Sequence, residues 1–247
     1  MKGMWDIHSH ILNGIDDGAR TLEEALAILK IEASQGVEHV ILTPHYRIGM
    51  FEPDMELINQ QYSLLKKAVR EVWEHENARG SMKLYLGCEF HSNMDMIETL
   101  DAKRRPTMAG TRCVLVEFSS IDYFTYMRER CFSLLNNGYR PIIAHAERYD
   151  TLRQNNMKHL EELKEIGCLI QINASSILGE DGWLIRRWCH NAIKKNLVHF
   201  IASDAHDLSI RRPRMDECYA LLKKKYGKSV ARRLLIRNAQ NLFMDER

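Results

Sequence analysis

Residues 4–10, Met4-Trp5-Asp6-Ile7-His8-Ser9-His10, run from an apolar start into two histidines that are two positions apart. Residues 198–206 repeat this design near the other end of the chain, because the apolar run there ends in Ser203-Asp204-Ala205-His206. Every second side chain of a β-strand points to the same face, so each pair can contact one common ion. A single pair is a weak signal, but two such pairs favour a barrel in which the first and last strands are neighbours.

Seven short apolar segments alternate with amphipathic stretches along the chain. We expect strands at residues 4–8, 37–43, 83–90, 112–118, 141–145, 168–173 and 198–203. We expect helices at residues 21–35, 53–79, 123–137, 156–166, 183–196, 213–226 and 229–243. The first helix opens with a Thr21-x-x-Glu24 capping box and ends at Gly36. The strands are almost continuously apolar, as parallel strands buried on both faces are.

This alternation predicts an α/β fold, and two architectures fit it. One is a distorted (β/α)7 barrel, related to the TIM barrel, that forms a single domain over residues 1–247; the other is a doubly wound open sheet. No low-complexity or Pro/Gly-rich linker divides the sequence. Polar residues follow most of the strands, and only a closed barrel brings so many strand ends to one mouth. We therefore predict the barrel.

Nine acidic and histidine side chains lie at or just beyond the ends of these segments. They are His8, His10, Asp17, His45, Glu89, Glu117, His145, Asp204 and His206. Taken singly, such a histidine is more often a hydrogen-bonded core residue, and Asp17-Gly18 is an ordinary turn. Taken as a set, they offer the mixed imidazole and carboxylate ligands of a cluster of divalent metals. A carboxylate such as Glu89 or Glu117 is costly at the end of a buried strand without a cation.

Arginines follow two of these candidate ligands closely. Arg148 comes three residues after His145, and Arg211-Arg212 come soon after His206. The planar guanidinium suits phosphate oxygens, so Arg148 and Arg211 are predicted to bind phosphate, which favours a phosphate ester over a neutral amide. Surface solvation or an ion pair is the alternative. The doubling at 211–212 leaves open which arginine acts, and His91 receives no assigned role.

Composition excludes several classes of protein. The chain has 247 residues, of which 45% are hydrophobic and 28% charged, and its net charge of +2 argues against a protein that coats nucleic acid. No uninterrupted apolar stretch reaches the length of a membrane span and no signal peptide is evident, so we expect a cytoplasmic protein without membrane insertion. The six cysteines are dispersed and include no C-x-x-C pair, so we expect buried, reduced thiols.

Charge is distributed unevenly between the two parts of the chain. From Thr151 onward there are 18 Lys and Arg against 11 Asp and Glu, a net charge of +7, which leaves −5 for the preceding part. A basic half could attract anionic substrates. Solvated helix faces explain the same surplus equally well.

These motifs resemble those of the PHP (polymerase and histidinol phosphatase) superfamily, and within it the bacterial protein-tyrosine phosphatases associated with capsule and exopolysaccharide synthesis. The matching motifs are Asp6-Ile7-His8-Ser9-His10, Ile15-Asp16-Asp17-Gly18-Ala19, Thr43-Pro44-His45-Tyr46-Arg47, Val116-Glu117-Phe118-Ser119, Ala144-His145-Ala146-Glu147-Arg148-Tyr149 and Ser203-Asp204-Ala205-His206. They span nearly the whole chain and occur in the order expected of the family.

The resemblance implies a distorted (β/α)7 barrel that holds three divalent ions, commonly Mn²⁺. It implies one ion on His8, His10, Glu89 and Asp204, a second on Glu89, Glu117 and His145, and a third on Asp17, His45 and His206. Mixed ligation without cysteine also admits Fe²⁺, Co²⁺ or Zn²⁺. Arg148 and Arg211 would hold the substrate phosphate.

The activity implied by the resemblance is hydrolysis of phosphotyrosine in a protein. The expected partner is the tail of a bacterial tyrosine kinase that controls capsule or exopolysaccharide synthesis, and no nucleic-acid partner is expected. Two alternatives stay open at this point. One is a PHP phosphoesterase that acts on a small molecule such as histidinol phosphate or on nucleic-acid ends, and the other is a non-catalytic phosphopeptide-binding module. No feature of the sequence indicates an oligomeric state.

Overall fold

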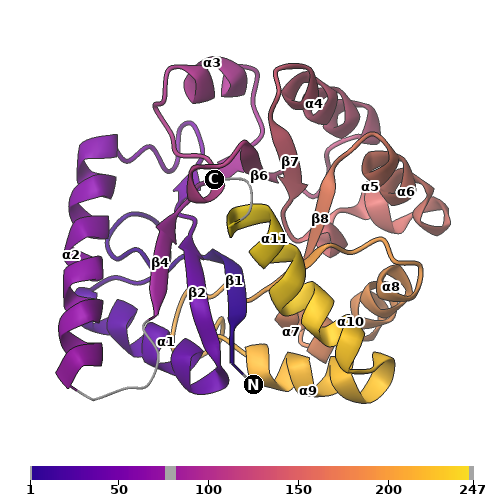
Figure 1. The fold of residues 1–247 in the computed structure, drawn as a ribbon. Coiled ribbons are helices and arrows are strands. Elements are labelled where there is room, and N and C mark those ends of the chain that lie inside the picture. The colour runs from indigo at the N-terminus through magenta and orange to yellow at the C-terminus, as the bar shows by residue number, and fades with distance from the viewer. Residues whose placement is uncertain (1, 76–81, 245–247) are drawn as a thin grey trace.

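The computed structural model describes residues 2–75 and 82–244 and consists of parallel strands surrounded by helices (Figure 1). The strands are β1 (Met4–Ser9), β2 (Val37–Leu42), β3 (His45–Tyr46), β4 (Lys83–Leu86), β5 (Glu89–His91), β6 (Cys113–Glu117), β7 (Arg140–Ile143), β8 (Leu169–Asn173) and β9 (Phe200–Ala202). The α-helices are α1 (Leu22–Gln35), α2 (Met55–His75), α3 (Met96–Asp101), α4 (Phe124–Asn136), α5 (Asp150–Arg153), α6 (Lys158–Glu165), α7 (Ala174–Leu178), α8 (Trp183–Lys194), α9 (Met215–Tyr226), α10 (Lys228–Arg232) and α11 (Asn238–Met244). Short 3-10 turns lie at Met108–Gly110, Ala146–Arg148 and Asn155–Met157.

The strands follow one another around a ring in the order of the sequence. One sheet has the order β1-β2-β4 and the other the order β3-β5-β6-β7-β8-β9, with every pairing parallel. β1 meets the end of β9 through the Ser9–Ala205 bridge and two backbone hydrogen bonds, His10 N–H to Ala205 O (2.8 Å) and Asp204 N–H to His8 O (2.9 Å). The predicted (β/α)7 barrel is therefore confirmed, and the open sheet is wrong.

Two of the seven predicted strands are interrupted, which corrects their expected extents. Residues 37–43 and 83–90 each form two segments, because β2 and β3 are separated by Thr43-Pro44 and β4 and β5 by Gly87-Cys88. Pro44 has no N–H to donate to a neighbouring strand. Gly87 has no room for a side chain, since a Cβ there would lie 2.9 Å from Met108 Sδ. The interruptions shift the strand line so that His45 and Glu89 begin new segments side by side.

The interior of the ring is apolar toward the beginning of the strands and is closed there by α11. Trp5, Phe200 and Phe243 belong to one buried cluster, and the ring of Phe243 lies 5.8 Å from that of Trp5. Figure 1 shows α11 crossing the open end of the ring. The helix predicted at 229–243 is broken by a π-helical turn at Arg233–Arg237, so α10 and α11 are separate pieces.

Other elements agree with expectation except at their ends. Helix α1 has the predicted cap, in which the Thr21 hydroxyl accepts a hydrogen bond from Glu24 N–H, and it ends at Gly36 with φ +93°. The helix expected at 53–79 is α2, and residues 76–79 of that prediction lie outside the described residues. Short helices α3, α5 and α7 were not predicted. The six cysteines are buried and unbridged, as expected, and no described helix has the length and apolarity to cross a bilayer.

Candidate metal centre

All nine predicted ligands gather where the strands end. His8 lies on β1, His45 on β3, Glu89 on β5 and Glu117 at the end of β6, while His10, Asp17, His145, Asp204 and His206 lie in the segments that follow β1, β7 and β9. Only Asp17, Glu117 and His45 keep any substantial exposure, so the centre is a nearly buried cluster. The structure therefore brings together residues separated by almost 200 positions in the sequence.

Glu89 occupies the middle of this cluster. Its Oε2 lies 3.2 Å from His8 Nε2, 3.1 Å from His10 Nε2 and 3.0 Å from His45 Nδ1. Its Oε1 lies 2.9 Å from His145 Nε2. A fully buried carboxylate that faces four imidazoles has the arrangement expected of a bridging metal ligand.

Asp204 forms a second meeting point beside Glu89. Its Oδ1 lies 3.4 Å from His8 Nε2 and 3.5 Å from His10 Nε2. Its Oδ2 lies 3.0 Å from an Nη2 of both Arg148 and Arg211. The two guanidinium groups thus converge on one carboxylate oxygen at the border of the cluster.

Arg211 and not Arg212 faces this centre. Arg212 Nη2 instead lies 4.0 Å from Glu217 Oε1, on the surface. Of the two arginines, Arg211 is the one that lies at the border of the cluster.

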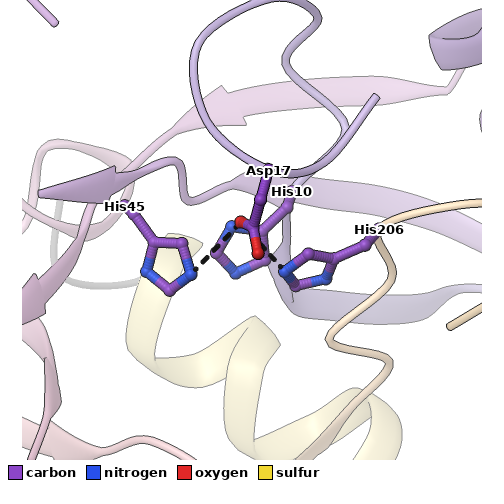
Figure 2. Close-up of side chains that lie close together, drawn as sticks. All are labelled: His10, Asp17, His45 and His206. Atoms are coloured by element: carbon purple, nitrogen blue, oxygen red, sulfur yellow. Dashed lines mark ion pairs between the residues drawn. The ribbon is translucent and has the colours of Figure 1, made fainter. Parts of the chain in front are cut away.

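Asp17 closes the outer side of the cluster, as Figure 2 shows. Its Oδ1 lies between two imidazoles, 3.6 Å from His45 Nε2 and 3.5 Å from His206 Nε2. His10 lies behind them, with its ring centroid 3.9 Å from that of His206. His10, Asp17, His45 and His206 can therefore surround a single ion.

Three further candidate groups overlap with this one or with one another. They are His8 with His10 and Asp204, His8 with Glu89 and His145, and His45 with Glu89 and Glu117. These overlapping sets use all nine predicted residues.

Hydrogen bonds from outside the cluster fix the orientation of the histidines. Asp16 Oδ2 lies 2.8 Å from His10 Nδ1, and Gln171 Oε1 lies 3.1 Å from His8 Nδ1. The backbone oxygen of Asp204 lies 2.9 Å from His206 Nδ1. Each of these rings turns its Nε2 toward the cluster, which is how protein metal sites orient imidazole ligands.

Three residues that support the candidate ligands had no predicted role. They are Asp16, Gln171 and Asn173. The Asn173 amide donates to Asp204 Oδ2 at 2.9 Å, and the Gln171 amide donates to Asn173 at 2.8 Å. Both lie on β8, the one strand to which no ligand was assigned. The sequence did contain a signal for these two residues, since Gln171 and Asn173 occupy alternate positions of a strand predicted to be buried. Buried amides need hydrogen-bond partners, so both side chains could have been expected to contact polar groups of the centre.

The donor atoms fit divalent cations, as their missing partners indicate. Glu89 Oε2, His45 Nδ1 and His206 Nε2 are buried without a hydrogen bond of acceptable geometry. His8 Nε2 and His10 Nε2 lie only 3.2 Å apart. Buried polar atoms are otherwise almost always satisfied, so these atoms converge as ligands do.

Electrostatics in the cluster is dominated by burial and by the shared carboxylates. Burial lowers the pKa of His8, but Glu89 and Asp204 outweigh it and raise the value to about 9. The pKa of His45 is also raised to about 9, with Glu89 again opposing burial. Burial and the nearby Glu89 raise the pKa of Glu117 to about 7. Without bound metal ions, His8 and His45 are therefore protonated at neutral pH.

Two residues of the centre have a backbone conformation that L-residues seldom adopt. His145 has φ +30° and Asp204 has φ +54°. Such strain costs free energy and is concentrated at functional sites. Here it turns both side chains inward directly after β7 and near the end of β9.

The other described histidines take no part in the candidate groups. His39 stacks on Trp5 at 4.1 Å, and His199 Nδ1 accepts a hydrogen bond from Ile170 N–H. His91 lies at the border of the centre, where its Nε2 is 3.3 Å from Ser119 Oγ.

Comparison with known proteins places this geometry in a family. Residues 4–244 match the family described as capsular polysaccharide synthesis, CpsB/CapC. The chain is 35% identical over 245 residues to the tyrosine-protein phosphatase CpsB of Streptococcus agalactiae, covering 97% of this chain and 98% of that one.

Solved structures show the same relationship at the level of the fold. A crystal structure from work on Bacillus subtilis YwqE and Streptococcus pneumoniae CpsB, described as metal-dependent tyrosine phosphatases, aligns over 99% of this chain and 96% of that one, with a TM-score of 0.88 and 27% identity. Histidinol phosphate phosphatase from Lactococcus lactis shares the fold alone, with a TM-score of 0.58, 14% identity and coverage of 94% of both chains. The chain belongs to the CpsB/CapC family.

Proposed function

We propose that this protein is a metal-dependent tyrosine-protein phosphatase that acts in the cytoplasm on a phosphotyrosine-bearing tail, that of a bacterial tyrosine kinase in capsule or exopolysaccharide synthesis. The observation that carries the proposal is the convergence of nine candidate ligand side chains, with Glu89 in their middle, next to the paired guanidinium groups of Arg148 and Arg211. The family relationship supports the same activity. Six unbridged cysteines suit a reducing compartment.

We assign the three ions to overlapping sets of ligands. The first takes His8, His10, Glu89 and Asp204. The second takes Glu89, Glu117 and His145, and the third takes Asp17, His45 and His206. His10 also lies close to the third set, but its Nδ1 is held by Asp16, so its one inward-facing nitrogen, Nε2, serves a single ion. Mn²⁺ is the proposed ion, and the donor set also suits Fe²⁺, Co²⁺ and Zn²⁺. Divalent ions held by these residues would lower the pKa of bound water to about 7 and so would provide a nucleophile at neutral pH.

The protein's own residues position the phosphate ester. Arg148 and Arg211 present their guanidinium groups side by side and offset charge on the phosphate oxygens. Asp204 holds both arginines in place, and Asn173 in turn holds Asp204. The leaving tyrosinate has a parent pKa of about 10, so it needs little help from a protonated side chain.

A thiol mechanism does not fit the cysteines. None of them is followed by an arginine six residues on, as the phosphate loop of thiol phosphatases requires. All six are buried, and burial raises the pKa of the Cys88 and Cys218 thiols, so neither forms a thiolate readily.

Apolar side chains around the mouth favour a polypeptide over a small molecule. Ile121, Tyr123 and Ile210 are each more than 80% exposed and lie on the segments that follow β6 and β9. Ile48 and Met50 add to them after β3. Exposed apolar groups around a charged centre suit contacts with residues that flank a phosphotyrosine.

Metal removal tests the proposal directly. After exhaustive dialysis against a chelator, hydrolysis of a phosphotyrosyl peptide should be abolished, and Mn²⁺ should restore it in proportion to the ions bound. Rates on histidinol phosphate and on single-stranded DNA ends should be much lower. Full activity in verified metal-free protein contradicts the metal mechanism, whereas tight peptide binding without phosphate release establishes a binding module instead.

A further inference from the structure

One face of α8 carries cations that the proposed catalysis does not use. Trp183, Arg186, Arg187, His190, Asn191 and Lys194 line a pocket of about 370 Å³ together with Lys225 from the last turn of α9. Their spacing along α8 places them on one side of the helix. The opposite side, which includes Trp188 and Ile193, is buried against the barrel.

The four cations of this pocket have no acidic partners. Among residues 2–75 and 82–244, no carboxylate oxygen lies within 4.0 Å of Arg186, Arg187, Lys194 or Lys225. Neighbouring cations are paired instead, as Lys195 is with Glu161 at 2.8 Å. Lys223 and Lys224 on α9 and Lys228 at the start of α10 are also exposed and contribute to the charge surplus after Thr151.

His190 adds a polar group with an unused nitrogen to the pocket. Its side chain is 94% buried, and its Nδ1 lies 2.7 Å from the Tyr226 hydroxyl. Its Nε2 is buried without a hydrogen-bond partner. Burial and the charges of Lys225, Arg186 and Lys194 lower the pKa of His190 to about 4, so the ring is neutral at physiological pH. In the tautomer in which Nδ1 accepts a hydrogen bond from the Tyr226 hydroxyl, Nε2 carries the proton that an anionic oxygen can accept.

Apolar side chains lie at the end of the same face. Trp183 and Leu184, at the start of α8, are 66% and 70% exposed. The guanidinium of Arg187 lies 5.5 Å from the centre of the Trp183 ring. Exposed Trp and Leu beside a row of Lys and Arg are typical of helices that lie in a membrane–water interface.

We infer that this α8 face docks the protein on a membrane surface rich in anionic phospholipid, with a headgroup phosphate in the pocket and Trp183 and Leu184 in the interfacial layer. The unpaired cations complement phosphate, and the adjacent Trp183–Leu184 pair has a role at a lipid surface that a soluble phosphate would not provide. The inference is independent of the proposed phosphatase activity, because none of these residues lies in the metal centre.

Vesicle co-sedimentation tests the inference. The full-length protein should bind equimolar phosphatidylcholine–phosphatidylglycerol vesicles, bind phosphatidylcholine vesicles at least about tenfold more weakly, and dissociate at high salt. Millimolar glycerol phosphate should not displace it. The triple variant Arg186→Gln, Arg187→Gln, Lys194→Gln should lose about tenfold in binding. The triple variant Lys66→Gln, Lys67→Gln, Arg70→Gln on α2 removes the same charge from another exposed face and should bind like the parent.

Trp183 provides a second readout. Its emission should shift to shorter wavelength on anionic vesicles, and Trp183→Ser should weaken binding more than Phe132→Ser, which removes an aromatic ring 51% exposed on α4. All variants should hydrolyse p-nitrophenyl phosphate at the parent rate, so failure of the phosphatase proposal would be seen separately.

Two results would overturn the inference. One is equal binding by the α8 variant and the α2 variant. The other is binding of soluble poly-glutamate without binding of anionic vesicles, which would assign the face to an acidic polypeptide.

Discussion

At the scale of single residues, Glu89 connects the candidate centre. One of its oxygens faces three imidazoles and the other faces a fourth. Burial raises its pKa, but His8 and His45 outweigh burial and hold the pKa of Glu89 well below its usual range. The carboxylate is therefore charged, and positive charge must remain next to it, as protons on the histidines or as metal ions.

The first prediction follows from this exchange of protons for metal. The pKa of both His8 and His45 is raised from 6.5 to about 9, so both carry a proton at pH 7 when no metal is bound. A ligating histidine must be neutral, so metal binding should release protons and strengthen as pH rises toward 9. Calorimetry in two buffers of different protonation enthalpy measures the number released at pH 7.

The metal-free protein should show the opposite trend in stability. The contribution of the protonated histidines is fully present below pH 6.5 and is lost as pH rises through about 9. Its thermal midpoint should fall over that window, and the midpoint of the metal-loaded protein should not. Metal binding at pH 7 without proton release contradicts this account.

A second prediction separates Arg211 from Arg212. Arg211 touches Asp204 at the centre, whereas Arg212 faces Glu217 on the surface. Arg211→Gln should lower kcat/KM on p-nitrophenyl phosphate by about 100-fold, because it removes a preorganised cation from the phosphate. Arg212→Gln is the matched control and should stay within about twofold of the parent, since exposed ion pairs contribute little. Equal losses in both variants would remove Arg211 from its assigned role.

At the scale of elements, the loop after β1 decides where Asp17 lies. Its chain folds back so that Ala19 N–H donates to His10 O at 3.0 Å. A Cβ on Gly18 would lie 1.9 Å from that same oxygen. Gly18 is therefore required by close backbone approach and not by its own φ angle.

The third prediction is that Gly18→Ala displaces this loop. We expect a loss of about 2–3 kcal/mol of stability, because the added methyl meets backbone that cannot move aside cheaply. Metal content should fall with it, as Asp17 leaves His45 and His206. Gly49→Ala is the control: its Cβ would meet nothing within 4 Å, so only its positive φ of +79° costs free energy, about 1 kcal/mol. Thermal melts and elemental analysis of both proteins measure the difference.

At the scale of the whole molecule, the two ends of the barrel differ in composition: one carries the candidate ligands and the other is filled by apolar side chains. The ends of the strands hold the candidate metal centre, and their beginnings are closed by α11, whose Phe243 is fully buried against Trp5 and Phe200. We therefore expect that stability can be altered without changing the chemistry.

The fourth prediction tests that separation. Phe243→Ala should cost about 3–5 kcal/mol through the cavity it leaves, and lower Tm by roughly 6–20 °C. The folded enzyme should keep its metal content and its kcat. Met244→Ala, at the neighbouring 43% exposed position, should change stability by less than about 0.5 kcal/mol. A Phe243→Ala protein that is folded but depleted of metal would show that the two ends are coupled.

Much of this organisation could be read from the order of residues alone. Apolar runs that end in His or Asp predicted seven parallel strands and nine ligands, because a strand too apolar to face water must be buried and a polar residue at its end must find a partner. The spacing of His8 and His10 already implied that both side chains point to the same face of a strand and can contact one ion. The reduced state of the cysteines followed from their scattered positions.

The tertiary structure decided what depends on packing between distant segments. Interruption of two strand lines at Pro44 and Gly87 places His45 beside Glu89, and no periodicity in the sequence signals that shift. Gln171 and Asn173 became supports of the centre only when β8 came to lie next to β7 and β9. Only the structure showed that the Arg211 side chain contacts Asp204, whereas that of Arg212 lies near Glu217. Sequence patterns report which side chains are buried, whereas the pairing of buried polar groups is settled only when the barrel closes and each must find a partner.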